Sequence, residues 1–389
     1  MRVKRIGVVG AGTMGAGIAQ LGCLGGLETV LHDPDPDALA TSAARLGAAL
    51  AKGAERGLWS VAEAASAKER LETVPFEGLA GCDLVIEAAP EDLDLKRRLF
   101  AGLAEVCGHE AVLATNTSSL PVTAIAAQVD GPERVCGMHF FNPPPLMRLV
   151  EVIAGERTGP GALETATAVA RAMDREPVRA ADSPGFIVNR CNRPFSLEAL
   201  RLLGEGAATH AQIDRAVRDL GGYRMGPFEL MDLIGVDVNL KVAQSFFSQR
   251  AEPRWEPHPI QAEMVAAGRL GRKSGRGFYE YREGRIVEPE AAGGDADGEA
   301  VGNAVEPEAI LEHIVSQLVN EASFAVEEGV AAEPDVDTAM RLGLNHPRGP
   351  FEWREKLGPA RIVAKLDELA AGGDAERYRV AGSLRTAAS

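Results

Sequence analysis

Three features that would indicate other kinds of protein are missing from the 389-residue sequence. It contains no run of 18 apolar residues, which argues against a membrane-spanning helix. Acidic residues outnumber basic ones, and the resulting net charge of −15 disfavours binding to nucleic acid or anionic lipid. The five cysteines show no C-x-x-C spacing. We therefore expect buried thiols in a reducing compartment such as the cytoplasm, and neither a disulfide framework nor a metal site.

Glycine, in contrast, is concentrated near the start of the chain. Residues 10–15 read Gly-Ala-Gly-Thr-Met-Gly between a short apolar strand and a helix of small residues, and a second strand ends at Asp33, 18 residues beyond the last glycine. This order is typical of a dinucleotide-binding turn, and the carboxylate favours the ribose hydroxyls of NAD over the 2′-phosphate of NADP. A glycine-rich loop in an ordinary α/β domain is the alternative, whereas five glycines between positions 7 and 17 disfavour a signal peptide. The predicted cofactor-binding residues are Gly10, Gly12, Thr13, Met14, Gly15 and Asp33.

A second informative stretch covers residues 137–153, where two apolar runs flank three consecutive prolines. His139 lies near the end of the first run and Glu151 lies in the second, so an antiparallel return would set the imidazole against the carboxylate. The carboxylate would fix one ring nitrogen and leave the other as a general base. A structural His–Glu hydrogen bond is an equally good reading of the spacing alone.

Taken together, these segments resemble the 3-hydroxyacyl-CoA dehydrogenase family over about residues 3–281. The family pattern His-Phe-Phe-Asn-Pro followed by Met-x-Leu-Val-Glu occurs at 139–151. Further matches are Asn-Thr-Ser-Ser-Leu at 116–120, Asp-Ser-Pro-Gly-Phe-Ile-Val-Asn-Arg at 182–190 and two glycine-containing motifs at 225–232 and 271–279.

The resemblance implies a role for each matched residue. His139 would take the proton from the 3-hydroxyl group, and Glu151 would orient it. Ser118 and Asn189 would hydrogen-bond the reacting oxygen or the thioester carbonyl. Residues that would line NAD are Glu91, Lys96, Ser118, Asn142 and Lys273.

Some of these residues also have a plainer interpretation. Without the resemblance, Glu91 and Lys96 would read as a solvated helix face. Lys52 and Arg56, spaced i, i+4 on the helix after Asp33, are candidates for contacts to the CoA phosphates, or are simply two solubilising charges. The family has a serine in this region where the chain has Ala49, which argues against that one contact.

The chain divides by pattern into four segments. Alternating short strands and helices over residues 1–183 predict a doubly wound, mainly parallel sheet, closed by an antiparallel pair around the prolines. Residues 184–282 read as an all-helical substrate domain beginning with a long helical segment near 186–203. Residues 283–307, rich in Gly, Ala, Glu and Asp, read as a linker, and 308–389 as a second helical domain.

The second helical domain is an internal repeat of the first. Shifting residues 187–235 by 123 aligns them with 310–358 at 14 identities in 49 positions, where composition alone gives roughly 4. Asn189 becomes Glu312 in the second copy, which we therefore interpret as structural. In single-copy relatives the helical domain typically dimerises, so we expect the two copies to form an internal pseudo-dimer.

The resemblance implies NAD-dependent interconversion of an (S)-3-hydroxyacyl-CoA and its 3-oxoacyl-CoA, and within that class we expect a short acyl chain such as 3-hydroxybutyryl. The alternative is 3-hydroxyadipyl-CoA, because residues 193–200 and the tandem architecture resemble phenylacetate-pathway members. A gulonate-type sugar-acid dehydrogenase and a crystallin-like protein without turnover are weaker alternatives.

Overall fold

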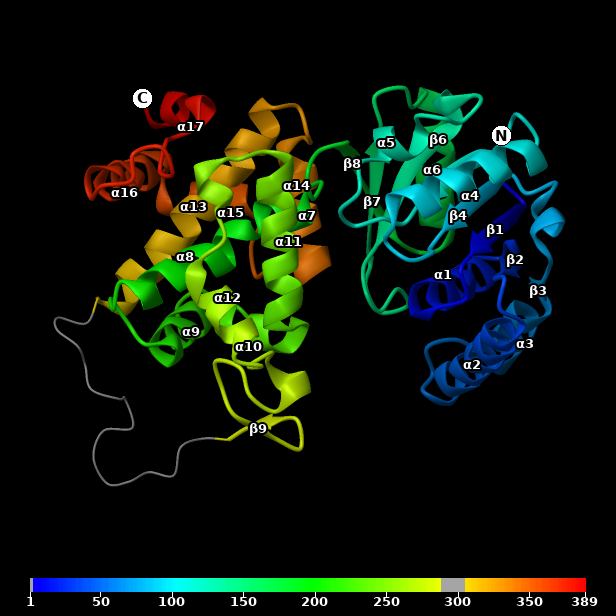
Figure 1. Ribbon diagram of the computed structural model, residues 1–389, viewed down its shortest axis with the longest axis horizontal. Helices are drawn as coiled ribbons and strands as arrows, with labels where there is room; N and C mark the ends of the chain where they lie inside the picture. The colour runs from blue at the N-terminus through cyan, green and yellow to red at the C-terminus, as the bar shows by residue number, and fades with distance from the viewer. Residues whose placement is uncertain (1–2, 288–304) are drawn as a thin grey trace. The chain divides into compact units, whose positions relative to one another are not determined.

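The computed structural model describes residues 3–287 and 305–389. They belong to two compact units, Met1–Phe186 and Ile187–Ser389, which are described separately below (Figure 1).

The first unit is built on an eight-stranded sheet with strand order β3-β2-β1-β4-β5-β6-β7-β8. The strands are β1 (Arg5–Val9), β2 (Glu28–His32), β3 (Leu71–Thr73), β4 (Leu84–Glu87), β5 (Val112–Thr115), β6 (Val135–Phe140), β7 (Leu149–Ala154) and β8 (Glu176–Ala181). Strands β1 to β6 are parallel, β7 is antiparallel to β6, and β8 is parallel to β7. The predicted sheet, with its antiparallel pair around the prolines, is confirmed.

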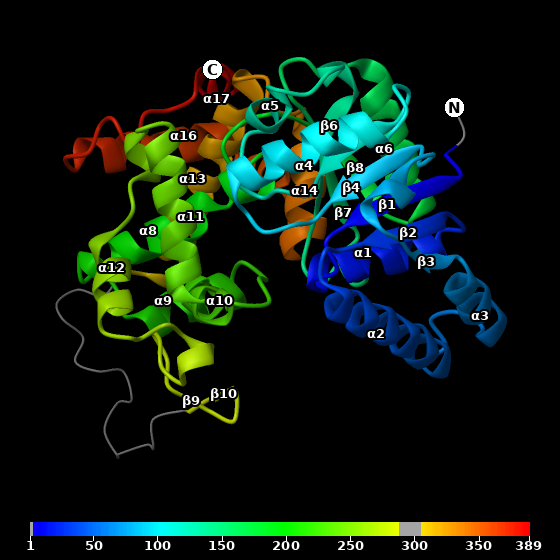
Figure 2. The ribbon, with the colours of Figure 1, turned by 45° about the vertical axis from the view of Figure 1, so that its right-hand side comes forward.

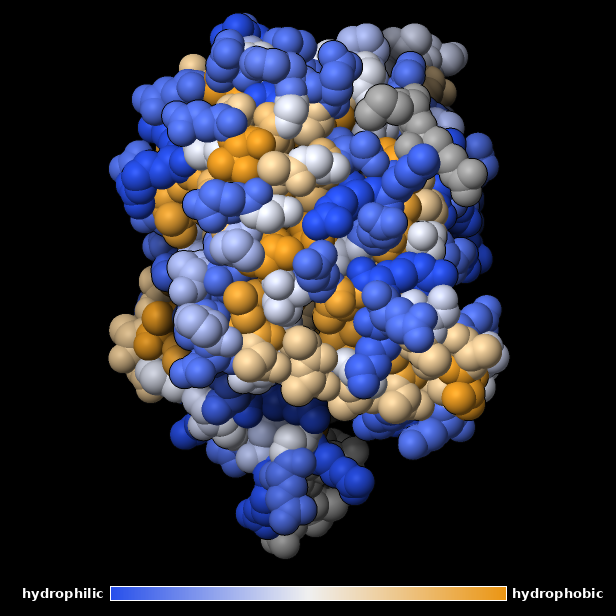
Figure 3. All heavy atoms as spheres, turned by 90° about the vertical axis from the view of Figure 1, so that its right-hand side faces the viewer, coloured by the Kyte–Doolittle hydropathy of each residue, from blue (hydrophilic) through white to orange (hydrophobic). Residues whose placement is uncertain are grey.

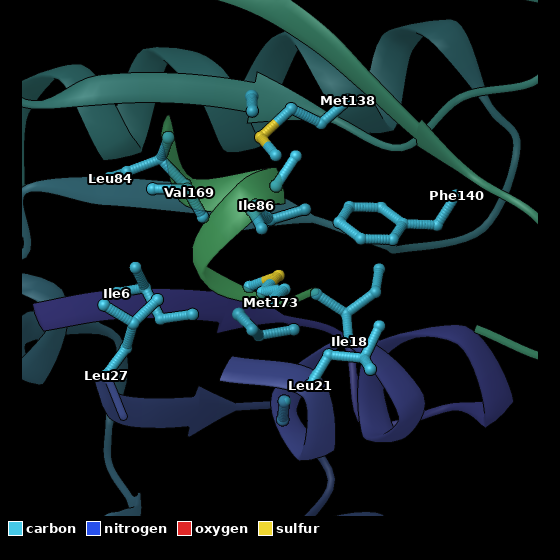
Figure 4. Close-up of a cluster of buried hydrophobic side chains, with 14 of the residues drawn as sticks. Ile6, Ile18, Leu21, Leu27, Leu84, Ile86, Met138, Phe140, Val169 and Met173 are labelled. Atoms are coloured by element: carbon cyan, nitrogen blue, oxygen red, sulfur yellow. The ribbon is translucent and has the colours of Figure 1, made fainter. Parts of the chain in front are cut away.

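Helices cover both faces of this sheet (Figure 1). They are α1 (Thr13–Leu24), α2 (Pro36–Glu55), α3 (Val61–Glu69), α4 (Leu93–Val106), α5 (Val122–Ala126) and α6 (Pro160–Ala172). Leu84 and Ile86 of β4 join side chains of α1 and α6 in one core (Figure 4). Val85 is buried but is not part of this core, since successive side chains of a strand point to opposite faces. Phe100 of α4 is likewise buried outside it.

The second unit begins with α7 (Val188–Cys191), α8 (Arg193–Gly204), α9 (His210–Asp219), α10 (Pro227–Ile234), α11 (Val236–Gln249) and α12 (Pro259–Ala266). It ends with α13 (Pro307–Glu327), α14 (Glu333–Leu344), α15 (Pro350–Leu357), α16 (Pro359–Ala371) and α17 (Gly382–Ala388). The starts of α9, α10 and α11 precede those of α14, α15 and α16 by the same 123 positions (210 to 333, 227 to 350, 236 to 359). The sequence repeat is therefore a repeat of helices.

The two repeats also share a helix cap. Asp214 accepts a hydrogen bond from a backbone N–H in the first turn of α10 (2.9 Å), and Asp337 does the same for α15 (2.8 Å). The glycines that precede these helices, Gly226 and Gly349, approach the aspartates so closely that a Cβ would collide with them. This close approach explains why both copies have glycine at this position.

The repeats differ at their first helix. The second copy has one 21-residue helix, α13, where the first has α7 and α8 on either side of Asn192. Pro194 has no N–H to donate to the carbonyl of Arg190, whereas Gln317 occupies the equivalent position in α13. The single segment predicted for 186–203 is thus two helices.

The predicted linker was partly wrong. Strands β9 (Tyr281–Arg282) and β10 (Arg285–Ile286) pair as an antiparallel hairpin (Figure 2), so the helical unit also contains strands. Glu283 and Gly284 both have positive φ, the backbone conformation of a tight hairpin turn. Residues 288–304 of the predicted linker lie outside the described residues, and α13 begins at Pro307.

Hydrophobic and hydrophilic side chains are interspersed on the face of the molecule in Figure 3. Within 3–287 and 305–389, no helix is long and apolar enough to cross a membrane. The same residues contain no cluster of side chains suited to a metal ion. The cysteines are all buried and free, namely Cys23, Cys82, Cys107, Cys136 and Cys191.

Candidate active site

The predicted site residues of the first unit gather at one edge of the sheet. Strands β1, β4, β5 and β6 are neighbours and run parallel, so their carboxyl ends lie side by side. The glycine turn follows β1, Glu91 follows β4, Ser118 follows β5 and the exposed Asn142 follows β6. The strand order reverses between β1 and β4, which is where open α/β sheets bind dinucleotides.

His139 and Glu151 are direct partners in the antiparallel register of β6 and β7. Met138 and Phe140 point into the core of Figure 4, so His139 between them points to the opposite face. Nδ1 of His139 lies 2.5 Å from a carboxylate oxygen of Glu151, and both residues are buried. The predicted pairing is present, and it leaves Nε2 as the ring nitrogen not engaged by Glu151.

The glycine turn has the local geometry that a pyrophosphate needs. Gly10 has a φ of +103°, and a Cβ there would collide with the carbonyl of Ala88. A Cβ on Gly15 would collide with the carbonyl of Gly10, so only glycine allows α1 to pack this close. A Cβ on the exposed Gly12 would meet nothing within 4 Å, so a ligand can approach the backbone there. These residues, followed by Thr13 and Met14 in the first turn of α1, fit a dinucleotide.

Asp33 is held beside this turn. One oxygen of its carboxylate accepts a hydrogen bond from the backbone N–H of Ala11 (2.8 Å), and the other accepts from the N–H of Asp35 (3.0 Å). The carboxylate at the end of β2 is thus fixed next to the glycine turn, as recognition of a ribose requires.

Lys96 is not on a solvated helix face. Its side chain is 1% exposed, and its ammonium group lies 2.7 Å from a carboxylate oxygen of Glu87, which is itself fully buried. The second oxygen of Glu87 accepts a hydrogen bond from the hydroxyl of Thr115 (2.8 Å). This ion pair ties α4 to β4 and β5 beneath the site edge.

Glu91 positions the serine loop. One of its oxygens accepts hydrogen bonds from the hydroxyl of Thr117 (2.6 Å) and from the backbone N–H groups of Ser118 and Ser119 (3.1 Å each). Burial alone would raise the pKa of Glu91, but these hydrogen bonds and the charge of Lys96 lower it below its ordinary value. An ionised Glu91 therefore holds the backbone of Ser118 at the end of β5.

Two predicted site residues belong to the second unit. Asn189 lies in α7. The ammonium group of Lys273 lies 2.6 Å from a carboxylate oxygen of Asp237. The contact of Lys273 with the cofactor remains a prediction.

Lys52 and Arg56 are both exposed at the carboxyl end of α2, where Arg56 is the residue that caps the helix. The surface position suits either of their two interpretations, so the proposed phosphate contact remains a prediction.

Sequence reasoning missed Glu87. The available signal was a carboxylate at the end of an otherwise apolar strand, Leu-Val-Ile-Glu at 84–87. A charge at that position of a buried strand requires a partner, and Lys96 is the cation nine residues further along.

Replacing Asp33 by Ala should narrow the preference for NADH over NADPH. The substitution removes both a ribose hydrogen-bond acceptor and the charge that repels a 2′-phosphate. We expect kcat/KM with NADH to fall by about tenfold and the NADH/NADPH ratio to fall further, measured by initial rates with each cofactor. A wild-type enzyme that used both cofactors equally would contradict the role of Asp33.

Comparisons with known proteins identify the same family over most of the chain. The NAD-binding domain of 3-hydroxyacyl-CoA dehydrogenases matches residues 5–183, and the C-terminal domain of the same family matches twice, at 185–281 and 310–388. The second match coincides with the internal repeat.

The relatives include proteins that match this chain from end to end and shorter ones that lack the second repeat. The 3-hydroxyadipyl-CoA dehydrogenase of Escherichia coli K12 is 37% identical, with 99% of this chain and 97% of the relative covered. The 3-hydroxybutyryl-CoA dehydrogenase of Clostridioides difficile is 38% identical and covers 72% of this chain with its full length. A crystal structure described as 3-hydroxybutyryl-CoA dehydrogenase from Escherichia coli K12 superimposes with a TM-score of 0.90 at 37% identity, covering 100% of this chain and 98% of that one. The chain belongs to the 3-hydroxyacyl-CoA dehydrogenase family and is an NAD-dependent dehydrogenase.

Proposed function

We propose that His139 is the general base in the oxidation of an (S)-3-hydroxyacyl-CoA to its 3-oxoacyl-CoA. The observation that carries this role is the buried hydrogen bond between Nδ1 and Glu151. It directs Nε2 to the substrate, where that nitrogen accepts the proton of the 3-hydroxyl group. The carboxylate opposite Nδ1 stabilises the resulting imidazolium. NAD, when bound, accepts the hydride from C3, and in the reverse direction His139 returns the proton.

The remaining site residues have supporting roles in this proposal. Ser118 and Asn189 donate hydrogen bonds to the oxygen on which charge develops. Glu91 fixes the loop of Ser118, and Lys96, Asn142 and Lys273 contribute to the cofactor site. Five buried, free thiols support a cytoplasmic location.

The substrate is a CoA thioester of short chain length in this proposal. The relatives named for 3-hydroxybutyryl-CoA support a four-carbon acyl group, whereas the end-to-end match to a 3-hydroxyadipyl-CoA dehydrogenase supports a six-carbon dicarboxylic one. The intact pair of His139 and Glu151 disfavours a protein without turnover.

Loss of NADH absorbance tests the activity directly. The purified full-length protein is assayed with acetoacetyl-CoA, 3-oxoadipyl-CoA and gulonate, the last with NAD in the oxidative direction. We expect turnover of the CoA thioesters and none of gulonate. Absence of turnover with every 3-oxoacyl-CoA would refute the proposal.

We also propose that the second repeat takes the place that a partner's helical domain has in a twofold dimer. Helix α13 packs against α7, α8 and α9 of the first repeat. Arg190 of the first repeat lies 2.8 Å from Glu321 of the second. The equivalents of these two residues, 123 positions away, are His313 and Glu198, and they also lie 2.8 Å apart.

Such reciprocal pairs are what an isologous interface requires. In such an interface residue i of the first copy meets residue j of the second, and residue j of the first copy meets residue i of the second. Tethering on one chain raises the effective concentration of the second copy to about the millimolar range, which favours it over a separate chain.

Truncation after residue 285 should therefore destabilise the remaining protein. The deletion removes α13, which packs against α8 and α9 and shares a hydrophobic core with the fully buried Leu200 and Ile213. We expect aggregation or a new dimer, measured by size-exclusion chromatography with light scattering against the full-length protein. A stable, active monomer of the truncated chain would contradict the proposal.

A further inference from the structure

Arg193, at the start of α8, is a buried arginine that no carboxylate of the described residues neutralises. It is 5% exposed. Its Nε donates a hydrogen bond to the backbone carbonyl of Asn189 (3.1 Å), while its Nη1 is buried with no hydrogen-bond partner in the described chain. The three other arginines buried in this unit each form an ion pair with a glutamate, namely Arg190, Arg201 and Arg254.

An uncompensated buried charge is unfavourable, and burial lowers the pKa of Arg193 to about 10. The group still carries its proton at neutral pH. The ring of Phe246, whose centroid lies 5.6 Å from the guanidinium carbon, is the aromatic group beside it. A cation–π contact stabilises the cation without supplying the negative charge that it lacks.

The position of Arg193 indicates which anion would supply that charge. Nε of Arg193 lies 3.1 Å from the backbone carbonyl oxygen of Asn189, so the guanidinium group and Asn189 are direct neighbours. Asn189 binds the oxygen at the reacting end of the acyl group in the proposed function. An anion at Arg193 would then belong to a part of the acyl chain a few bonds beyond C3, which is where a 3-hydroxyadipyl group has its terminal carboxylate.

We propose that Arg193 binds the terminal carboxylate of a dicarboxylic 3-hydroxyacyl-CoA and determines specificity for that substrate class. This proposal rests on the proposed function. The planar guanidinium presents parallel donors that match a carboxylate, and its donors are partly unused in the protein itself. The end-to-end relative is named for 3-hydroxyadipyl-CoA, which is a substrate of this class.

The test compares two substrates of equal length. 3-Oxoadipyl-CoA and 3-oxohexanoyl-CoA both have six-carbon acyl chains and differ in the terminal carboxylate. We expect the wild-type enzyme to prefer the dicarboxylic substrate in kcat/KM by about 10- to 100-fold, as for a charge-assisted hydrogen bond in a buried site. Competitive inhibition by adipyl-CoA and hexanoyl-CoA should show the same order without any chemical step.

Replacement of Arg193 should remove this preference. In Arg193→Met the ratio of kcat/KM for the two substrates should fall to about threefold or less, and Arg193→Lys should retain part of it because the charge remains. The ratio is insensitive to a partial loss of folded enzyme, and a wild-type ratio near one would overturn the proposal even where Arg193→Met does not fold.

Arg201→Met is the matched control, because it removes another buried arginine from the same helix, one that is paired with Glu198. It should lower stability and leave the substrate ratio at the wild-type value. A wild-type ratio near one, or equal loss of the ratio in Arg193→Met and Arg201→Met, would overturn the role of Arg193 while leaving the dehydrogenase activity in place. No turnover of either substrate would instead refute the proposed function itself.

Discussion

Replacing His139 by Gln should lower kcat by about 10²- to 10⁴-fold, the range expected when a general base is lost. Glutamine is similar in size and polar, so the contacts of β6 with its neighbours are largely kept. Its amide cannot accept the proton of the 3-hydroxyl group at neutral pH. The measurement is steady-state oxidation of NADH with a saturating 3-oxoacyl-CoA.

NADH binding, followed by fluorescence titration, is the control for His139→Gln. The affinity should stay near the wild-type value, because the glycine turn and Asp33 follow other strands. Glu151→Gln should also lower kcat, since the neutral amide no longer stabilises an imidazolium 2.5 Å away. Turnover of His139→Gln near that of the wild type would remove His139 from the mechanism.

The second large effect is expected in the helical unit. Glu321 is 1% exposed, and its two oxygens lie 2.8 Å from Nε of Arg190 and 2.6 Å from Nε of Arg254. Glu321→Gln keeps the shape of the side chain but leaves two buried guanidinium groups without this counter-charge. Breaking a buried pair in this way costs about 3–5 kcal/mol of unfolding free energy. The remaining carboxylate of Glu328, 3.0 Å from Arg190, places the expected loss near the lower end.

Urea unfolding followed by circular dichroism measures this loss. Glu312→Gln is the matched control, since Glu312 lies on the same helix and pairs with the exposed Arg361. An exposed pair contributes about 1 kcal/mol or less, so this variant should remain close to the wild type. Equal losses of unfolding free energy in the two variants would show that the buried pair stabilises the protein no more than the exposed pair does.

Local patterns in the sequence were sufficient for the parts of the site that depend on strand periodicity. Residues 138–140 alternate between the core and the opposite face, and the three prolines at 143–145 separate two strands of matching length. The antiparallel register of His139 and Glu151 follows from these two features. The glycine turn was predictable from local requirements as well, because Gly10 and Gly15 leave no room for a Cβ and Gly12 leaves the backbone open to a ligand.

Features that depend on neighbours distant in the chain were not predictable. Charges such as Lys96 usually indicate a solvated face, and only the packing of α4 against the sheet shows that this one is buried. The hairpin at 281–286 is local, but it lies at the start of a segment rich in Gly and Glu, and this linker-like composition concealed it. The missing partner of Arg193 becomes visible only when every surrounding group is placed.

The duplicated helices have a consequence for how this protein can vary. In a symmetric dimer each mutation appears twice, so a change that helps one subunit is imposed on the other. On a fused chain the copies mutate independently. The pairs across the repeats already show this, since Arg190 faces Glu321 whereas its counterpart His313 faces Glu198. The position of Asn189 has likewise become Glu312, which pairs with Arg361. Selection can therefore adjust each half of the helical unit separately, one for chemistry and the other for support.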